Sequence, residues 1–133
     1  MFGGPVEVGG SGYTLAMANK VPLVLTELVR RAQAPDFPWT ELRPSVYIHR
    51  LYESEGGSSA ALLRYAPGGQ VPRHRHDGYE QIFVLTGSQQ DERGVYAAGS
   101  LVINPSGTEH TVDSPEGCLV LAVWERPVAF AGA

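Results

Sequence analysis

The sequence has 133 residues, 43% of them hydrophobic and 18% charged, which is typical of one globular domain and excludes a disordered chain. The formal net charge of -4 leaves no basic surface for nucleic acid, and no apolar run approaches the roughly 18 residues of a membrane span. The start of the chain lacks the pattern of a signal peptide, and the single cysteine, Cys118, cannot form an internal disulfide. We therefore expect a cytoplasmic protein with neither a nucleic-acid nor a membrane partner.

Residues 1–16 are rich in glycine and offer little to bury, so we expect a flexible N-terminal segment followed by one domain over residues 17–133. Residues 17–29 are ambiguous, because their apolar side chains fit both the alternation of a strand and the stripe of a helix. Pro22 restricts this segment to the edge of a sheet or to the start of an element. This segment could supply an added edge strand.

From residue 45 onward, short segments rich in β-branched and aromatic residues alternate with turn signals. Strands at a spacing of roughly eight to twelve residues, with 16 glycines and 10 prolines in the chain, predict an all-β sandwich or barrel. The predicted strands are residues 45–53, 60–65, 71–76, 80–86, 89–92, 95–97, 100–104, 110–113 and 118–125.

His74 and His76, which are separated by a single residue, lie at the end of the predicted strand 71–76. On a strand both face the same side, about 6.6 Å apart, which lets two imidazoles converge on one ion. Glu80 would lie about 13 Å beyond His76 on an unbroken strand, so the Asp-Gly reversal at residues 77–78 must bring it back. Since the strand that follows has an apolar inner face, a carboxylate at its start needs a partner, and a cation supplies one.

His110 follows a second turn, Pro105 to Gly107, and can begin a neighbouring strand that completes the site. Three neutral imidazoles and one carboxylate leave a divalent ion with open coordination positions for water, oxygen or an anionic oxygen ligand. This donor set suits Zn, Fe(II), Mn, Ni, Cu or Co and does not choose among them.

The two stretches 68–87 and 99–114 resemble the two sequence motifs of the cupin superfamily. The first motif is matched at every spacing by Gly68, His74, His76, Glu80 and Gly87. The second is matched by Gly99, Pro105, Gly107 and His110, with Ser114 where the family has Asn. That Asn is not a metal ligand in the family, so the departure concerns a turn.

Further segments resemble the ChrR-like cupins, namely residues 62–68, 91–94, 104–105 and 114–118. These cupins include one half of ChrR-type anti-sigma factors and stand-alone relatives, some of them dioxygenases acting on diketones or hydroxyacetophenones. The resemblance implies a double-stranded β-helix, the cupin jelly-roll barrel. It also implies a homodimer with zinc or iron favoured at a site made by His74, His76, Glu80 and His110.

The resemblance implies a metal-dependent dioxygenase-type oxidoreductase acting on a small oxygenated, diketone- or phenol-like molecule in the barrel. The alternative is a non-catalytic, ChrR-like metal-binding sensor or regulatory module, and a metal-assisted isomerase or lyase ranks last because no acid/base pair is evident. The anti-sigma factors carry a separate helical zinc-binding domain that has no counterpart before residue 45, so we do not expect direct sigma-factor binding.

Three residues near the motifs are candidates for contact with the metal's surroundings or the substrate. His49 has no other candidate ligand at a suitable spacing, so we expect an ordinary strand residue. Alternatively, it could face the cavity and support a metal ligand or carry a proton. Arg64 is a surface charge, or an anchor for an anionic substrate if it points into the barrel. Tyr65 is a strand aromatic that could line the mouth, and no catalytic residue can be named.

Overall fold

The computed structural model describes residues 20–130, and the chain divides into two compact units at Pro38–Trp39. The flexible segment predicted over residues 1–16 and the domain start predicted at residue 17 lie outside the described residues. No helix within residues 20–130 is long and apolar enough to cross a membrane.

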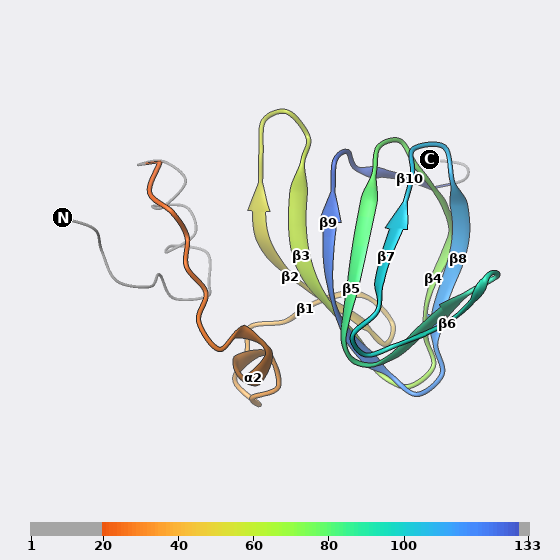
Figure 1. The fold of residues 1–133 in the computed structure, drawn as a ribbon. Helices are drawn as coiled ribbons and strands as arrows, with labels where there is room; N and C mark the ends of the chain where they lie inside the picture. The colour runs from red at the N-terminus through yellow and green to blue at the C-terminus, as the bar shows by residue number, and fades with distance from the viewer. Residues whose placement is uncertain (1–19, 131–133) are drawn as a thin grey trace. The chain divides into compact units, whose positions relative to one another are not determined.

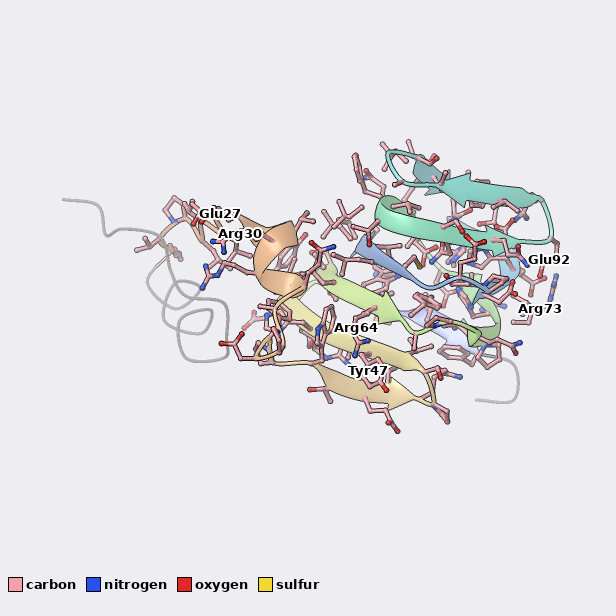
Figure 2. The ribbon with its side chains drawn as sticks, turned by 90° about the horizontal axis from the view of Figure 1, so that it is seen from below. Glu27, Arg30, Tyr47, Arg64, Arg73 and Glu92 are labelled. Carbon is pink, nitrogen blue, oxygen red and sulfur yellow. The ribbon has the colours of Figure 1, made fainter. Side chains whose placement is uncertain are left out.

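The first unit, in its described residues 20–38, contains one short helix, α2 (Leu28–Ala32). Of the ambiguous segment 17–29, residues 20–29 contain the start of this helix and no strand. The carboxylate of Glu27 forms an ion pair with Arg30 at 2.7 Å across the first turn (Figure 2). Both side chains are exposed, so we assign this pair little weight in stability.

The second unit is a sheet of ten strands. The strands are β1 (Thr40–Arg43), β2 (Val46–Glu53), β3 (Ser59–Tyr65), β4 (Gly69–His76), β5 (Glu80–Asp91), β6 (Gly94–Ala97), β7 (Leu101–Asn104), β8 (Glu109–Ser114), β9 (Cys118–Trp124) and β10 (Val128–Phe130). Two differences from the sequence-based prediction stand out. Strands β1 and β10 were not predicted, and the predicted strands 80–86 and 89–92 form one continuous strand, β5.

The strand order is β1-β2-β3-β9-β5-β8-β4-β10, with β6 and β7 also paired to β5 (Figure 1). Every pairing is antiparallel. The first part of β5 pairs with β9 and β7, and its last residues pair with β6, so this one strand connects the two halves of the curled sheet. The all-β fold class is thereby confirmed.

The concave side of the sheet holds the core, and its residues come from strands far apart in the sequence. Inward side chains alternate with exposed ones along β4 and the start of β5, as expected for strands with one buried face. The core residues are Val46, Ile48, Ala61, Leu63, Tyr65, Val71, Ile82, Val84, Val112, Cys118, Val120 and Ala122.

A bulge in β4 decides which way its histidines point. Val71 lies opposite Val112 on β8, but the next paired residue, His74, lies opposite His110, so β4 carries one extra residue. Strict alternation from Val71 would turn His74 outward. The extra residue resets the alternation, and His74 and His76 face the interior together with Val71.

A second bulge does the same in β5. Val84 lies opposite Val120 on β9, whereas Thr86 lies opposite Leu119, so Leu85 is the additional residue. Before the bulge the even-numbered residues face inward, and after it the odd-numbered residues Gln89 and Asp91 do.

Gly87 follows this second bulge and lies against the turn before β9. Its φ is +72°, a conformation that an L side chain rarely adopts. An added Cβ would overlap the carbonyl oxygen of Gly117. The close approach of the two backbones therefore requires glycine at this position.

Gly87→Ala should lower the free energy of unfolding by about 3 kcal/mol or more, because backbone strain and steric overlap act together. Gly99→Ala is the matched control: its φ is +92°, but nothing lies within 4 Å of the added Cβ. The control should lose only about 1–2 kcal/mol. Urea unfolding measures both, and equal losses would show that the approach of Gly117 is unimportant.

Candidate metal centre

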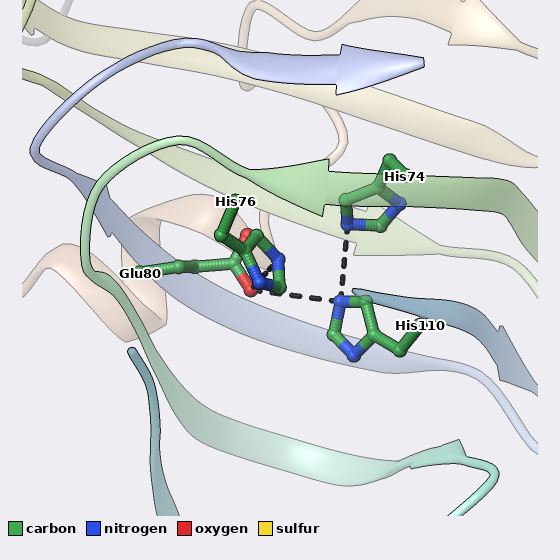
Figure 3. Close-up of side chains that lie close together, drawn as sticks. All are labelled: His74, His76, Glu80 and His110. Atoms are coloured by element: carbon green, nitrogen blue, oxygen red, sulfur yellow. Dashed lines mark hydrogen bonds and ion pairs between the residues drawn. The ribbon is translucent and has the colours of Figure 1, made fainter. Parts of the chain in front are cut away.

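Three strands bring four side chains to one point inside the sheet. His74 and His76 come from β4, Glu80 begins β5, and His110 lies near the start of β8. All four are buried, the most exposed being His74 at 6%. Their donor atoms lie within 4.8 Å of one another (Figure 3). The structure thus brings together the four side chains that the sequence analysis grouped.

The reversal between β4 and β5 returns Glu80 to the histidines. The Asp77 carbonyl accepts a hydrogen bond from the Ser106 hydroxyl at 3.0 Å. The backbone N–H of Tyr79 donates to the Glu125 carboxylate at 2.9 Å. The second turn, which carries Ser106, and Glu125, the residue after β9, therefore both contact the Asp-Gly turn and hold it in place.

The ring nitrogens and the carboxylate oxygen of the cluster are close enough to one another to contact a single ion. The Nε2 atoms of His74 and His110 are 3.0 Å apart. The Glu80 Oε1 atom lies 3.0 Å from Nε2 of His76 and 3.7 Å from Nε2 of His110. All three imidazoles therefore present the same ring nitrogen, Nε2, to the centre of the cluster (Figure 3).

The outer contacts of the three rings assign the proton to Nδ1 in each of them. Nδ1 of His74 lies 2.9 Å from the Pro72 carbonyl, which can only accept, so this nitrogen donates. Nδ1 of His110 lies 3.0 Å from a carboxylate oxygen of Asp91 and donates in the same way. Nδ1 of His76 lies 2.9 Å from Oγ1 of Thr108, whose hydroxyl proton is already donated to the Pro105 carbonyl at 2.6 Å. The Thr108 oxygen therefore accepts from His76.

With the protons on Nδ1, each neutral ring directs an Nε2 lone pair into the cluster. The close Nε2 contact of His74 and His110 then has no proton to share. Nε2 of His76 is buried and has no hydrogen-bond partner. Unpaired buried acceptors are costly, and one cation at the centre would satisfy all three. The donor set therefore fits a metal ion.

Glu80 is fixed as an anion by two donors outside the histidine group. Its Oε1 accepts from Asn104 Nδ2 at 3.0 Å, and its Oε2 accepts from the Trp124 indole N–H at 2.7 Å. Burial by itself would raise the pKa of the Glu80 carboxyl, but the Trp124 hydrogen bond and, when no ion is bound, a proton on Nε2 of His76 lower it below its usual value. Burial, opposed by the Pro72 hydrogen bond, lowers the pKa of His74. Both shifts favour the forms that bind a metal.

Asp91, at the end of β5, fixes the orientation of His110. Its carboxylate also accepts from the Tyr96 hydroxyl and the Arg93 backbone N–H, both at 2.8 Å. Burial would raise the pKa of Asp91, but the hydrogen bonds from His110, Tyr96 and Arg93 lower it. Burial and the bond to Asp91 raise the pKa of Tyr96 to about 12. Asp91 is therefore a charged acceptor behind a site histidine.

The rest of the segment 91–94 attaches the β5–β6 hairpin to β8 around His110. Glu92 accepts a hydrogen bond from the backbone N–H of Thr111 at 2.6 Å, and Arg93 donates to the Glu109 carbonyl at 3.2 Å. Arg73, from the β4 bulge, lies 3.9 Å from Glu92 and 3.3 Å from Glu109 (Figure 2).

A cavity of about 540 Å³ opens onto the cluster. His74, Glu80 and His110 line it, whereas His76 does not. Aliphatic side chains make up much of its wall: Ile48, Leu63, Val71, Ile82 and Val112. A volume of this size suits a small organic molecule.

Of the three further candidates from the sequence, only Tyr65 lines the cavity. Burial raises the pKa of Tyr65, so its hydroxyl stays protonated. His49 is buried opposite Leu62 in the β2–β3 ladder but is absent from the cavity wall. Arg64 is also absent from the wall, and its guanidinium lies 4.2 Å from the Tyr47 ring centroid (Figure 2). The same guanidinium lies 5.6 Å from the ring centroid of Trp39.

The residues that orient the cluster were not predicted from the sequence: Asp91, Asn104, Thr108 and Trp124. Asp91 and Asn104 lie in segments that carry the family resemblance. The sequence therefore pointed to these residues but not to their contacts with His110 and Glu80. Thr108 and Trp124 gave no signal, because their contacts with His76 and Glu80 span 32 and 44 residues.

Comparison with known proteins agrees with this fold. A family described as the ChrR Cupin-like domain matches residues 29–129. No protein with a curated description matches the sequence.

Three solved structures illustrate the similarity. One is the structure of Rhodobacter sphaeroides SigE in complex with the anti-sigma ChrR. The matched chain is 28% identical in sequence, the match covers 84% of our chain and 73% of that chain, and the TM-score is 0.61. An acetylacetone dioxygenase from Acinetobacter johnsonii is 19% identical over 82% and 80%, with a TM-score of 0.67. A cupin-like protein of unknown function from Ralstonia eutropha JMP134 is 20% identical over 66% of this chain, with a TM-score of 0.61. Our chain spans 60% of the length of that protein.

These structures share the cupin jelly roll that the sequence predicted, and the family match covers most of the chain, including both motifs. The chain belongs to the ChrR cupin-like domain family.

Proposed function

We propose that this protein is a divalent-metal-binding cupin in which His74, His76, Glu80 and His110 hold one ion. We further propose that it is a dioxygenase-type oxidoreductase for a small oxygenated, diketone- or phenol-like substrate. The observation that carries the metal proposal is the convergence of three Nε2 lone pairs and one carboxylate in a buried site. Zinc and Fe(II) are the favoured ions, and Fe(II) is the one suited to oxidation.

The ion, when bound, would supply a Lewis acid with open positions for substrate oxygens and O2. The protein's own residues provide the surroundings. His74, Glu80 and His110 present the site to the cavity, while the aliphatic wall holds the substrate and excludes water. Tyr65 keeps its proton and can donate a hydrogen bond to a substrate oxygen in the cavity.

The similarity to an acetylacetone dioxygenase supports the catalytic proposal through the fold alone. The alternative is a non-catalytic sensor or regulatory module, in which the metal is structural or responds to a ligand. The specific observation that favours this alternative is the higher identity, 28% against 19%, to the structure of SigE with the anti-sigma ChrR.

Replacement of both His74 and His76 by Ala should abolish stoichiometric metal binding, because two of the three imidazole donors are lost. Elemental analysis of protein purified without added metal, and again after incubation with zinc, measures this. His49→Gln is the control, since it removes a histidine that lies outside the cavity wall. Full metal content in the double variant would refute the assigned ligands.

Asp91→Ala should weaken metal affinity by about 10- to 100-fold, because His110 loses the charged acceptor that fixes its proton on Nδ1. Competition with a chromophoric chelator gives the affinity. Tyr96→Phe is the matched control, since it removes a hydrogen bond to the other oxygen of Asp91 and leaves His110 paired. The role assigned to Asp91 is wrong if the two variants bind metal equally well.

Protein reconstituted anaerobically with Fe(II) should consume oxygen when given acetylacetone or a catechol. An oxygen electrode measures the rate, and the His74/His76 double variant with equal Fe(II) gives the background of free iron. Full occupancy by Fe(II) without consumption above this background would count against the dioxygenase and favour the sensor module.

A further inference from the structure

We infer that the cavity selects small organic acids, and that Arg43 binds their carboxylate while an oxygenated group at the other end faces the metal ligands. This inference deepens the proposed function by adding a carboxylate to the small oxygenated substrate, and only the metal end of the arrangement rests on that function. The candidate anion-binding residue lies on β1, a strand that the sequence analysis did not predict.

Arg43 lines the same cavity as His74, Glu80 and His110. It is the last residue of β1 and lies opposite Val46 of β2 in the ladder. Its guanidinium carbon is 5.3 Å from the centroid of the Phe130 ring. That ring in turn lies 5.5 Å from the ring of His74, so a single aromatic side chain separates the guanidinium from the candidate metal centre.

The guanidinium of Arg43 lacks the partner that most arginines here possess. Its Nε atom is buried and has no hydrogen-bond partner. Within residues 20–130, no carboxylate forms an ion pair with it, whereas several other arginines pair with carboxylates: Arg30, Arg50, Arg73, Arg75 and Arg93. Phe130 offers only the face of its ring, which leaves the buried Nε–H of the guanidinium without an acceptor.

Neither carboxylate of the cavity wall forms an ion pair with Arg43. Glu80 accepts hydrogen bonds from Asn104 and Trp124, and a bound ion would balance its charge. The other cavity carboxylate, Glu53, lies 3.5 Å from Arg50, and both side chains are more than half exposed. Arg43 is partly buried and its Nε–H has no acceptor, so the cavity favours a ligand anion that can pair with it.

A carboxylate is the anion that best fits this position. The planar guanidinium matches a carboxylate with two parallel hydrogen bonds. Tyr65, which also lines the cavity and stays protonated, can add a neutral donor. The aliphatic residues of the wall suit a short hydrocarbon chain joining the carboxylate to a keto or hydroxyl group. A keto acid has all three parts.

The test compares levulinate, a keto acid, with levulinamide, its uncharged counterpart of the same shape. Calorimetric titration should show wild-type protein binding levulinate at least about tenfold more tightly. Arg43→Gln should remove this preference, and Arg43→Lys should retain part of it because the charge remains without the planar pair of donors. Arg50→Gln, which removes a cavity-rim arginine already paired with Glu53, is the matched control and should retain it.

Each titration is done on zinc-loaded and on metal-free protein, because a carboxylate can also bind a metal directly. A preference that persists without metal and depends on Arg43 supports the inference even if the proposed metal function fails. If metal binds at the four ligands but Arg43→Gln keeps the preference, the inference fails and the proposed function stands. Wild-type protein that shows no preference, or binds neither compound at millimolar concentration, also overturns the inference, whether or not the variants fold.

Discussion

Each histidine of the candidate metal centre donates its Nδ1 proton to an acceptor outside the cluster, and the rest of the site depends on this constraint. The acceptors are a backbone carbonyl, a threonine hydroxyl and the carboxylate of Asp91. Since a neutral imidazole carries one ring proton, all three Nε2 atoms are left as lone pairs directed at Glu80 and at one another. The sheet thus builds a buried site whose inward lone pairs one cation would satisfy.

The sequence predicted the ligands well because their chemistry and spacing are local: two histidines on one strand, a reversal and a carboxylate. It predicted less well where orientation depends on register. Strict alternation along β4 cannot place both Val71 and His74 on the inner face, and the bulge that does so appears only when β4 pairs with β8. The β5 bulge likewise turns Asp91 inward. Strands β1 and β10 are four and three residues long, too short for a periodic pattern.

Arg64 was considered from the sequence as an arginine that could line the cavity, but the arginine found near the candidate metal centre is Arg43. An arginine pointing into the barrel was expected to hold an anionic substrate. In β3, however, Leu63 and Tyr65 line the cavity, so the intervening Arg64 faces the other side and lies over Tyr47. Arg43 reaches the cavity instead, because β1 adds to the edge of β2 and brings its last residue over Phe130.

The position of Arg43 bears on both candidate functions. Strands β1 and β10 are the two ends of the strand order, so Arg43 and Phe130 meet where the wall of the sheet is closed by side chains rather than by a ladder of backbone hydrogen bonds. A ligand anion at Arg43 would lie at this seam and, through Phe130, beside His74. In an oxygenase the contact would align the substrate with the metal. In a sensor it would couple ligand binding to the two end strands of the sheet. The same cavity chemistry therefore serves either function, and turnover with oxygen is what separates them.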